Sequence, residues 1–307
     1  MKLRDALEMF LLSAVWGASF ILIKLAGIDL PPVWVAFARL TFGSLFLWTV
    51  LKFGRHKLPP RKLIGALFAV GILNNALPFC LFAWGEQTVP SSIAAIINAT
   101  TPIWALLLGL AVGSAHATRL TAAGVALGFL GVLGVVYGHT SGGAAGANGF
   151  VFGAILIAIA SLSYGAGAVT AKRWLHGVEP VVIATFQLSL AGLALIPLAL
   201  FGPHPTALHW KSLAAVIVLG VLGSGLAYLL FFRLLATISP TRTVAVTFVL
   251  PIWGLLWGFV AGEEIHWTAL AGVAVVLAGL VLLNLHPRAK TAVIVPASPQ
   301  PCPAERA

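Results

Sequence analysis

The sequence predicts an all-α integral membrane protein that crosses the bilayer ten times, as two inverted five-helix repeats. Three observations predict this fold class: a scarcity of charge, a series of long apolar runs, and a similarity between the two halves of the chain. Of the 307 residues, 60% are hydrophobic and only 8% are charged, whereas a soluble domain carries about 25% charged residues. Such a surface is suited to lipid and not to water.

The apolar runs have the length at which a helix crosses a hydrocarbon core of about 30 Å. A segment in that core must satisfy its own backbone hydrogen bonds, and the alternating strands of a membrane barrel are missing. The first run is interpreted as a retained span and not as a signal peptide, because Asp5 and Glu8 interrupt its start. The predicted spans cover residues 6–24, 31–52, 63–84, 89–112, 119–138, 149–171, 180–201, 211–234, 240–261 and 267–285.

The spans divide the chain into four parts. Residues 1–138 are predicted to form the first five-helix repeat, and residues 149–286 the second. Between them, residues 139–148 (HTSGGAAGAN) form a linker. Residues 287–307 are rich in Pro and Ala and have no long apolar run, so they are predicted to be a disordered cytoplasmic tail.

Basic residues gather on one side of the predicted bundle. Fifteen of the 18 lysines and arginines fall in the N-terminus, in the loops after the even-numbered spans and in the tail, whereas the other side has only Lys24 and Lys211. Cytoplasmic loops carry the excess of Lys and Arg, so both termini are predicted to be cytoplasmic. This topology accounts for the net charge of +10, and no nucleic-acid partner is expected.

The two halves of the chain resemble each other at a shift of 148–149 residues. WGA at 16–18 falls on YGA at 164–166, and PIW at 102–104 falls on PIW at 251–253. Matched Pro and Trp over the whole length exceed the chance agreement of two apolar sequences, and they indicate two copies of one structural unit.

An odd number of spans in each repeat places the two copies in opposite orientations. The charges agree, because the five basic residues of the loop after the second span correspond to a single lysine, Lys211, in the second half. Inverted repeats are a common build of secondary transporters, in which outward-open and inward-open states exchange around a central site. A small-molecule transporter is therefore the favoured function.

Pro102 and Pro251 lie inside the fourth and ninth predicted spans. Proline lacks an amide hydrogen and clashes with the preceding turn, so each is predicted to kink its helix. Interrupted spans at matching positions of two repeats indicate a binding site. The alternative is that these prolines only shape helix packing.

Polar and aromatic side chains at mid-depth of the spans are candidates for substrate binding. Asn98 and Thr247 lie on equivalent stripes of small and polar residues, which should face protein or a water-filled cavity. Hydrogen bonding between helices is the alternative for both. The predicted substrate-binding residues are Trp16, Asn75, Phe79, Asn98, Tyr164, Tyr228, Thr247 and Trp257.

Arg39 is the one charged residue predicted to lie deep in a span. An arginine at this depth is a functional hypothesis, although a structural role is favoured because the sequence offers no carboxylate at equal depth. All histidines fall in loops or at span ends, so no buried proton relay is evident. Proton coupling through Glu8 or Glu86 is an open alternative.

Other classes of function have less support. The sequence lacks a Walker A loop, an HExxH zinc helix and a GxSxG nucleophile elbow, so no enzymatic activity, cofactor or metal is expected. Channels are usually rings of several subunits, whereas an internal inverted repeat suits a carrier that acts as a monomer. A membrane scaffold or receptor is the third alternative.

The chain resembles the EamA-type, ten-span exporters of the drug/metabolite transporter superfamily. The resemblance covers residues 6–285 and rests on four segments. These are WGASF (16–20), FARLTFG (37–43), TPIWALLLGLAVG (101–113) and LPIWGLLWGFVAGEE (250–264).

The resemblance implies a single-chain carrier of the bacterial inner membrane. Many members of the family export amino acids and related metabolites. The resemblance also implies that spans 1, 3, 4, 6, 8 and 9 surround a central cavity and that spans 5 and 10 lie outside. Arg39, on the second span, would then be peripheral. The first half departs from the pattern, because it has Ser114-Ala115 where the second has Glu263-Glu264.

The sequence therefore predicts a multi-pass exporter of neutral or aromatic amino acids that works by alternating access. The amide, hydroxyl and aromatic candidates suit a zwitterion with an apolar side chain. A drug, nucleoside or vitamin would suit the same residues and is the alternative substrate class.

Overall fold

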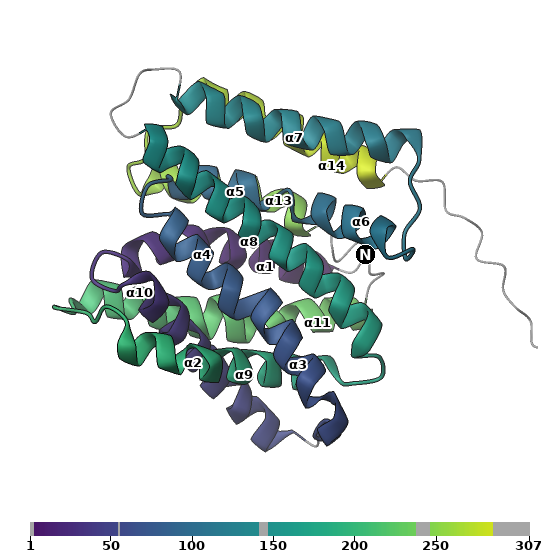
Figure 1. Ribbon diagram of the computed structural model, residues 1–307, viewed down its shortest axis with the longest axis vertical. Helices are drawn as coiled ribbons and strands as arrows, with labels where there is room; N and C mark the ends of the chain where they lie inside the picture. Colours follow the sequence, from purple (N-terminus) through teal and green to yellow (C-terminus); the bar gives the residue numbers. More distant parts are fainter. Residues whose placement is uncertain (1–2, 55, 141–146, 238–245, 285–307) are drawn as a thin grey trace, which may run out of the picture.

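The structure is a computed structural model that describes residues 3–54, 56–140, 147–237 and 246–284 (Figure 1). All regular structure within these ranges is helical. The predicted tail lies outside the described residues, and so does most of the predicted linker.

The described part of the first half contains nine helical elements: α1 (Leu3–Ala26), α2 (Pro32–Phe53), η1 (Arg61–Leu63), α3 (Ile64–Gly71), η2 (Ile72–Ala76), α4 (Leu77–Gly85), α5 (Ser91–Asn98), α6 (Thr101–Ala111) and α7 (Arg119–Thr140). The described part of the second half contains α8 (Ala147–Trp174), α9 (Pro180–Phe201), α10 (Trp210–Gly220), η3 (Val221–Leu226), α11 (Ala227–Thr237), α13 (Val246–Val260) and α14 (Trp267–Asn284).

Eight helical runs of the described residues are long and apolar enough to cross a membrane. The elements η1, α3, η2 and α4 together form one such run, and α5 with α6 forms another. A third joins α10, η3 and the first residues of α11. The last two, α13 and α14, are apolar but shorter. A helical membrane protein is therefore confirmed, whereas the number of ten crossings stays a prediction.

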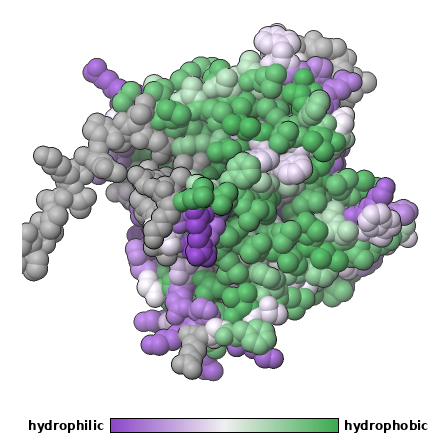
Figure 2. All heavy atoms as spheres, turned by 180° about the vertical axis from the view of Figure 1, so that it is seen from behind, coloured by the Kyte–Doolittle hydropathy of each residue, from purple (hydrophilic) through white to green (hydrophobic). Residues whose placement is uncertain are grey.

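The outer surface is apolar. In Figure 2, hydrophobic residues cover most of the visible face, and hydrophilic residues gather toward its margins. Large side chains such as Phe201, 89% exposed, and Leu193, 59% exposed, lie on the outside. In water each would forgo about 1.5–3 kcal/mol of burial free energy, whereas hydrocarbon accommodates them.

Helices α7 and α14 form a pair along one edge of the molecule, and the other helices make up the main bundle (Figure 1). The pair packs closely on glycine. A Cβ at Gly124 would lie 2.7 Å from the carbonyl oxygen of Gly279, and a Cβ at Gly279 would lie 2.7 Å from that of Gly124. Such small residues let membrane helices approach each other. The placement agrees with the expectation that spans 5 and 10 lie outside.

Contacts between the two halves come in pairs in which the halves exchange roles. Helix α1 packs on α13 as α8 packs on α5 and α6, and α2 packs on α10 and η3 as α9 packs on α3 and η2. Two glycines at matching positions allow close approach: a Cβ at Gly71 would lie 2.6 Å from the carbonyl oxygen of Gln187, and one at Gly220 would lie 2.8 Å from that of Arg39.

The ion pairs near the helix ends each join residues of one predicted side of the membrane. Lys24–Glu263 and Asp29–His209 lie on the predicted outer side, and Arg4–Glu8, Glu8–Arg233 and His56–Glu179 lie on the predicted cytoplasmic side. These pairs are consistent with the predicted order of loops. They do not depend on which side faces the cytoplasm, so the orientation stays a prediction.

Candidate functional site

A cavity of about 310 Å³ lies between helices of both halves. Its walls come from α1, α2, α4, α5, α6, α8, α11 and α13, and from η2 and η3. The volume is at the lower end of the range of about 300–1,000 Å³ for small-molecule sites. Six of the eight predicted substrate-binding residues line it: Trp16, Phe79, Asn98, Tyr164, Tyr228 and Thr247.

The other two predicted residues, Asn75 and Trp257, are not among the lining residues. Asn75 is fully buried, and its Oδ1 accepts a hydrogen bond from the Tyr228 hydroxyl at 3.2 Å, so it supports a lining residue. Trp257 donates from Nε1 to the carbonyl of Ala14 at 3.3 Å and stacks on Trp253. The structure thus places Trp257 in the contact between α1 and α13.

The fourth span is interrupted at the cavity wall. Helix α5 ends at Asn98, and α6 begins at Thr101. Pro102 has no N–H to donate to the carbonyl of Asn98, and the Thr101 hydroxyl donates to that carbonyl instead, at 2.8 Å. The same hydroxyl lies 3.3 Å from Oδ1 of Asn98. Pro251, by contrast, lies within the continuous helix α13.

Both halves contain a π-helical segment at matching positions. η2 (Ile72–Ala76) lies in the third span, and η3 (Val221–Leu226) lies in the eighth. π-Helical turns often occur at functional sites. The cavity receives Asn74 from η2, and Gly223 and Ser224 from η3.

Arg39 supplies charge to the cavity lining. The residue is 7% exposed, its Nε donates to Oγ of Ser224 at 2.9 Å, and its Cζ lies 3.7 Å from the centre of the Phe79 ring. The expectation that Arg39 would be peripheral is therefore wrong. Close packing of α2 on the end of α10, where Gly43 and Gly220 meet, and on η3 brings the Arg39 side chain between the two halves.

The two π-helical segments each hydrogen-bond the opposite half through one equivalent position. Asn75 of the first half pairs with Tyr228 of the second, and Ser224 of the second half pairs with Arg39 of the first. The residues at 75 and 224 match at the repeat shift of 149. Bonds of this kind between membrane helices contribute about 0.6–2 kcal/mol each.

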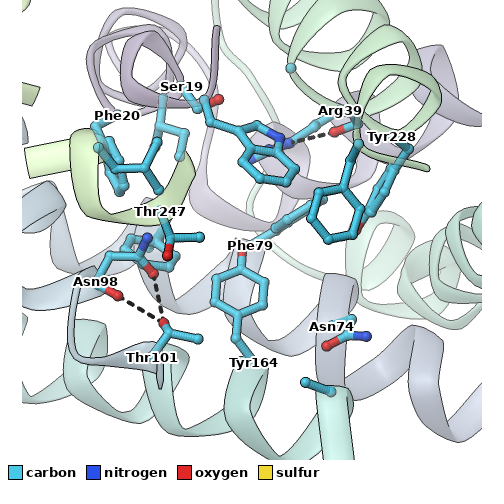
Figure 3. Close-up of a pocket in the computed structure, with 18 residues that line it drawn as sticks. Ser19, Phe20, Arg39, Asn74, Phe79, Asn98, Thr101, Tyr164, Tyr228 and Thr247 are labelled. Carbon is cyan, nitrogen blue, oxygen red and sulfur yellow. Dashed lines mark hydrogen bonds between the residues drawn. The ribbon is translucent and has the colours of Figure 1, made fainter. Parts of the chain in front are cut away.

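Polar groups lie on two sides of an aromatic space. In Figure 3, Arg39 and Tyr228 lie on one side of the pocket, Asn98, Thr101 and Thr247 lie on the other, and Tyr164 projects between them. The described lining residues include no acidic side chain. No three His, Cys, Asp or Glu side chains of the described residues gather as they would around a metal ion.

A carboxylate joins three elements at the predicted outer end. Glu263 accepts hydrogen bonds from the backbone N–H groups of Ser91 and Ser92, at 2.8 and 3.0 Å, and it pairs with Lys24 at 3.1 Å. Burial opposes ionisation of Glu263, but the hydrogen bonds from Ser92 and Ser91 outweigh it and lower its pKa to about 2. Its charge also suits the positive end of the α5 dipole.

Glu86, just beyond α4, is a second buried carboxyl at this end. It is 3% exposed, and neither of its oxygens has a hydrogen-bond partner among the described residues. Burial raises its pKa well above the usual value, against the opposing charge of Lys24. Burial in this arrangement therefore favours the neutral form of Glu86 more than water does.

The comparisons with known proteins agree with this geometry. The sequence matches the EamA-like transporter family over residues 6–137 and 151–285. The chain belongs to the EamA-like transporter family. It is 31% identical to the uncharacterized inner membrane transporter YedA of Escherichia coli K12, over 91% of this chain and 90% of YedA. The EamA family, its relatives' names and the apolar helices together establish a membrane transporter.

Two further relatives of this EamA-family chain are informative. It is 25% identical to a probable amino-acid metabolite efflux pump of Salmonella typhimurium, over 91% of this chain and 94% of the relative. A solved crystal structure of a protein with 19% sequence identity superposes with a TM-score of 0.63 and covers 92% of this chain and 96% of its own. At that identity the structural match supports the fold alone.

Several lining residues of this EamA-family transporter were missed by the sequence reasoning. Most of them follow a predicted residue at helical spacing on the same helix, as Ser19, Phe20 and Ile23 follow Trp16. Extending each predicted residue by i+3, i+4 and i+7 would have found them. The other missed lining residues with this spacing are Phe82, Ala168 and Phe231.

Proposed function

We propose that this EamA-family transporter exports small metabolites from a bacterial cell, with neutral and aromatic amino acids as the favoured class. The observation that carries the proposal is the cavity built by both halves, with aromatic walls and amide and hydroxyl groups. The relative named as a probable amino-acid metabolite efflux pump supports this substrate class and the outward direction. A drug, nucleoside or vitamin is the alternative substrate.

Alternating access between two inverted repeats is the proposed mechanism. Three features support it: the paired contacts between halves, the matching π-helical segments, and the bonds that each segment makes to the opposite half. Rocking of one half on the other would break the ion pair of Glu263 at one end or that of Glu8 with Arg233 at the other. A site between such repeats can then open to either side.

The proposed location is the inner membrane, with both termini in the cytoplasm. The excess of basic residues in one set of loops supports this orientation, and YedA is named as an inner membrane transporter. A reporter that is active only in the periplasm, fused after Pro60, should be silent. A fusion after Lys211 should be active, and the reverse pattern would overturn the orientation.

Counterflow in proteoliposomes tests the function directly. Vesicles containing the purified chain are loaded with one unlabelled compound, and entry of the same labelled compound is followed without an imposed gradient. Loading with L-phenylalanine should accelerate entry, whereas a nucleoside or a sugar should not. If only a nucleoside accelerates entry of its labelled form, nucleosides replace amino acids as the proposed substrate class. If correctly inserted protein accelerates the entry of none of these compounds, the proposal that it transports these classes is contradicted.

A further inference from the structure

The cavity has a positive charge with no acidic group beside it. Arg39 lines the cavity and is 7% exposed, and no Asp or Glu is among the described lining residues. The guanidinium group stays protonated in proteins. A charge removed from water and left without a counter-ion is costly, so an anion is the ligand that this cavity would stabilise most.

The Arg39 guanidinium group retains hydrogen-bonding capacity. Its Nε donates to Ser224 at 2.9 Å, and the ring of Phe79 lies against one face of the group, 3.7 Å from Cζ. Among the described residues, the side-chain hydrogen bond of Arg39 is made by Nε, and the four N–H groups of the two Nη atoms stay available to a ligand. These contacts fix the plane of the group and leave donors that match a carboxylate.

The rest of the cavity suits an apolar, planar body. Aromatic side chains surround the space beyond the guanidinium group, and the groups on the other side of the pocket in Figure 3 are the neutral Asn98, Thr101 and Thr247. No described lining residue offers a negative charge to a substrate ammonium group. The aromatic lining residues are Trp16, Phe20, Phe79, Phe82, Tyr164, Tyr228 and Phe231.

We propose that Arg39 binds the carboxylate of the transported molecule, and that the substrates are aromatic compounds with a carboxylate and not aromatic amines or amides that lack one. This inference rests on the proposed transport function and narrows its substrate class. An aromatic amino acid and an aromatic acid without an amine share this chemistry. In both, the carboxylate occupies the Arg39 side of the cavity, and the ring lies among the aromatic side chains.

Direct binding to the purified chain in detergent tests the assignment apart from transport. The labelled probes are 3-phenylpropanoate, L-phenylalanine, 3-phenylpropanamide and phenethylamine, which vary the carboxylate and the amine on one aromatic body. Both carboxylates should bind at least tenfold more tightly than the amide and the amine. Binding of L-phenylalanine without 3-phenylpropanoate would assign the site to amino acids, and binding of both would assign it to aromatic acids.

Variants separate a carboxylate ligand from a structural arginine. Arg39→Gln should weaken the binding of 3-phenylpropanoate at least tenfold and leave the binding of 3-phenylpropanamide unchanged or tighter. Arg39→Lys should restore part of the preference for the acid over the amide. Equal loss of the acid and the amide would overturn the proposal, and so would wild-type protein that binds the amide as well as the acid. If Arg39→Gln does not fold, Ser224→Ala keeps the charge and should weaken only the acid, by about two- to fivefold.

Counterflow with the same compounds distinguishes the two proposals. Carboxylates that bind through Arg39 but show no counterflow would support this assignment and contradict the transport function. Counterflow of the amide or the amine without that of either acid would support transport and overturn the assignment to Arg39. Absence of binding by every probe would also overturn it.

Discussion

The segments η2 and η3 share a backbone form and a position in their repeats, yet they present different side chains. η2 supplies Asn75, which supports Tyr228, and η3 supplies Ser224, which holds Arg39. The position that matches Arg39 is the fully buried Leu188. The two halves have thus kept the backbone that lets them pack on each other in the same way, whereas their polar chemistry has diverged.

This difference assigns two tasks to two kinds of residue. Glycines and π-helical segments recur at matching positions, and the glycines set how closely the halves approach. The arginine of the cavity lining and the carboxylate of the buried outer ion pair do not recur: Arg39 matches Leu188, and Glu263 matches Ser114. A symmetric scaffold with an asymmetric lining can exchange two similar states and still bind its substrate in one orientation.

The largest effect is expected at Glu263, because its matching residue in the first half, Ser114, has no carboxylate that could take over its contacts. Glu263→Ala removes the acceptor of the Ser91 and Ser92 N–H groups and the partner of Lys24. Breaking such a partly buried pair should destabilise this arrangement by about 3 kcal/mol. Thermal unfolding in detergent measures the change. The neighbouring Glu264 is exposed, and an equal loss in Glu264→Ala would show that Glu263 has no special role.

The paired glycines should respond alike if the backbone symmetry is real. Gly71→Ala and Gly220→Ala each place a Cβ less than 3 Å from a carbonyl oxygen of the opposite half, so each should cost about 1–3 kcal/mol. Gly65 has open space around it, and Gly65→Ala should leave stability unchanged or raise it. The unfolding temperatures of the three variants test this prediction. A large decrease for only one of Gly71→Ala and Gly220→Ala would contradict the backbone symmetry.

Asn98 and Thr247 sharpen the comparison at the lining. Asn98→Ala should reduce transport about fivefold without reducing membrane insertion, since one hydrogen bond contributes about 1 kcal/mol. Thr247→Val tests the equivalent position on the continuous helix α13. Initial rates of counterflow, normalised to inserted protein, provide the measurement. Unchanged transport in Asn98→Ala would remove this residue from the site.

The smallest effect is expected at Glu86, and it appears only as a dependence on pH. The folded state holds the Glu86 proton at pH values where the unfolded chain has released it. Its contribution is therefore most favourable below the usual pKa and is lost as pH rises. The charged groups that act on it are Lys24, Glu263 and Arg39. Glu86→Gln should flatten the decline in unfolding temperature as pH rises above the usual pKa of a glutamate, and an unchanged slope would contradict the raised pKa of Glu86.

Hydropathy and the repeat predicted the helical fold and six cavity residues, because lipid exposure and helical spacing leave a direct pattern in sequence. Asn75 was predicted to line the cavity, whereas its neighbour Asn74 does so. The reason is that a π-helical turn changes which side chains face a cavity, and the apolar sequence does not reveal such a turn. Arg39 was expected at the periphery because the family resemblance puts the second span outside the ring of cavity helices. The close packing of α2 on α10 and η3, which brings Arg39 to the cavity, depends on tertiary contacts such as that of Gly43 with Gly220. Trp257 lies in a helix contact that hydropathy alone does not separate from a cavity wall.

The pairing of α7 with α14 also has a consequence for biosynthesis. The ribosome completes α7 well before it begins α14 at Trp267, and at about 5–20 residues per second the interval is on the order of ten seconds. During that time the glycine face of α7, with Gly124 and Gly131, has no partner helix and is exposed to lipid or to the insertion machinery. This pair is therefore completed only at the end of translation, so a chain truncated before α14 would retain the cavity-forming helices and lack the partner of α7.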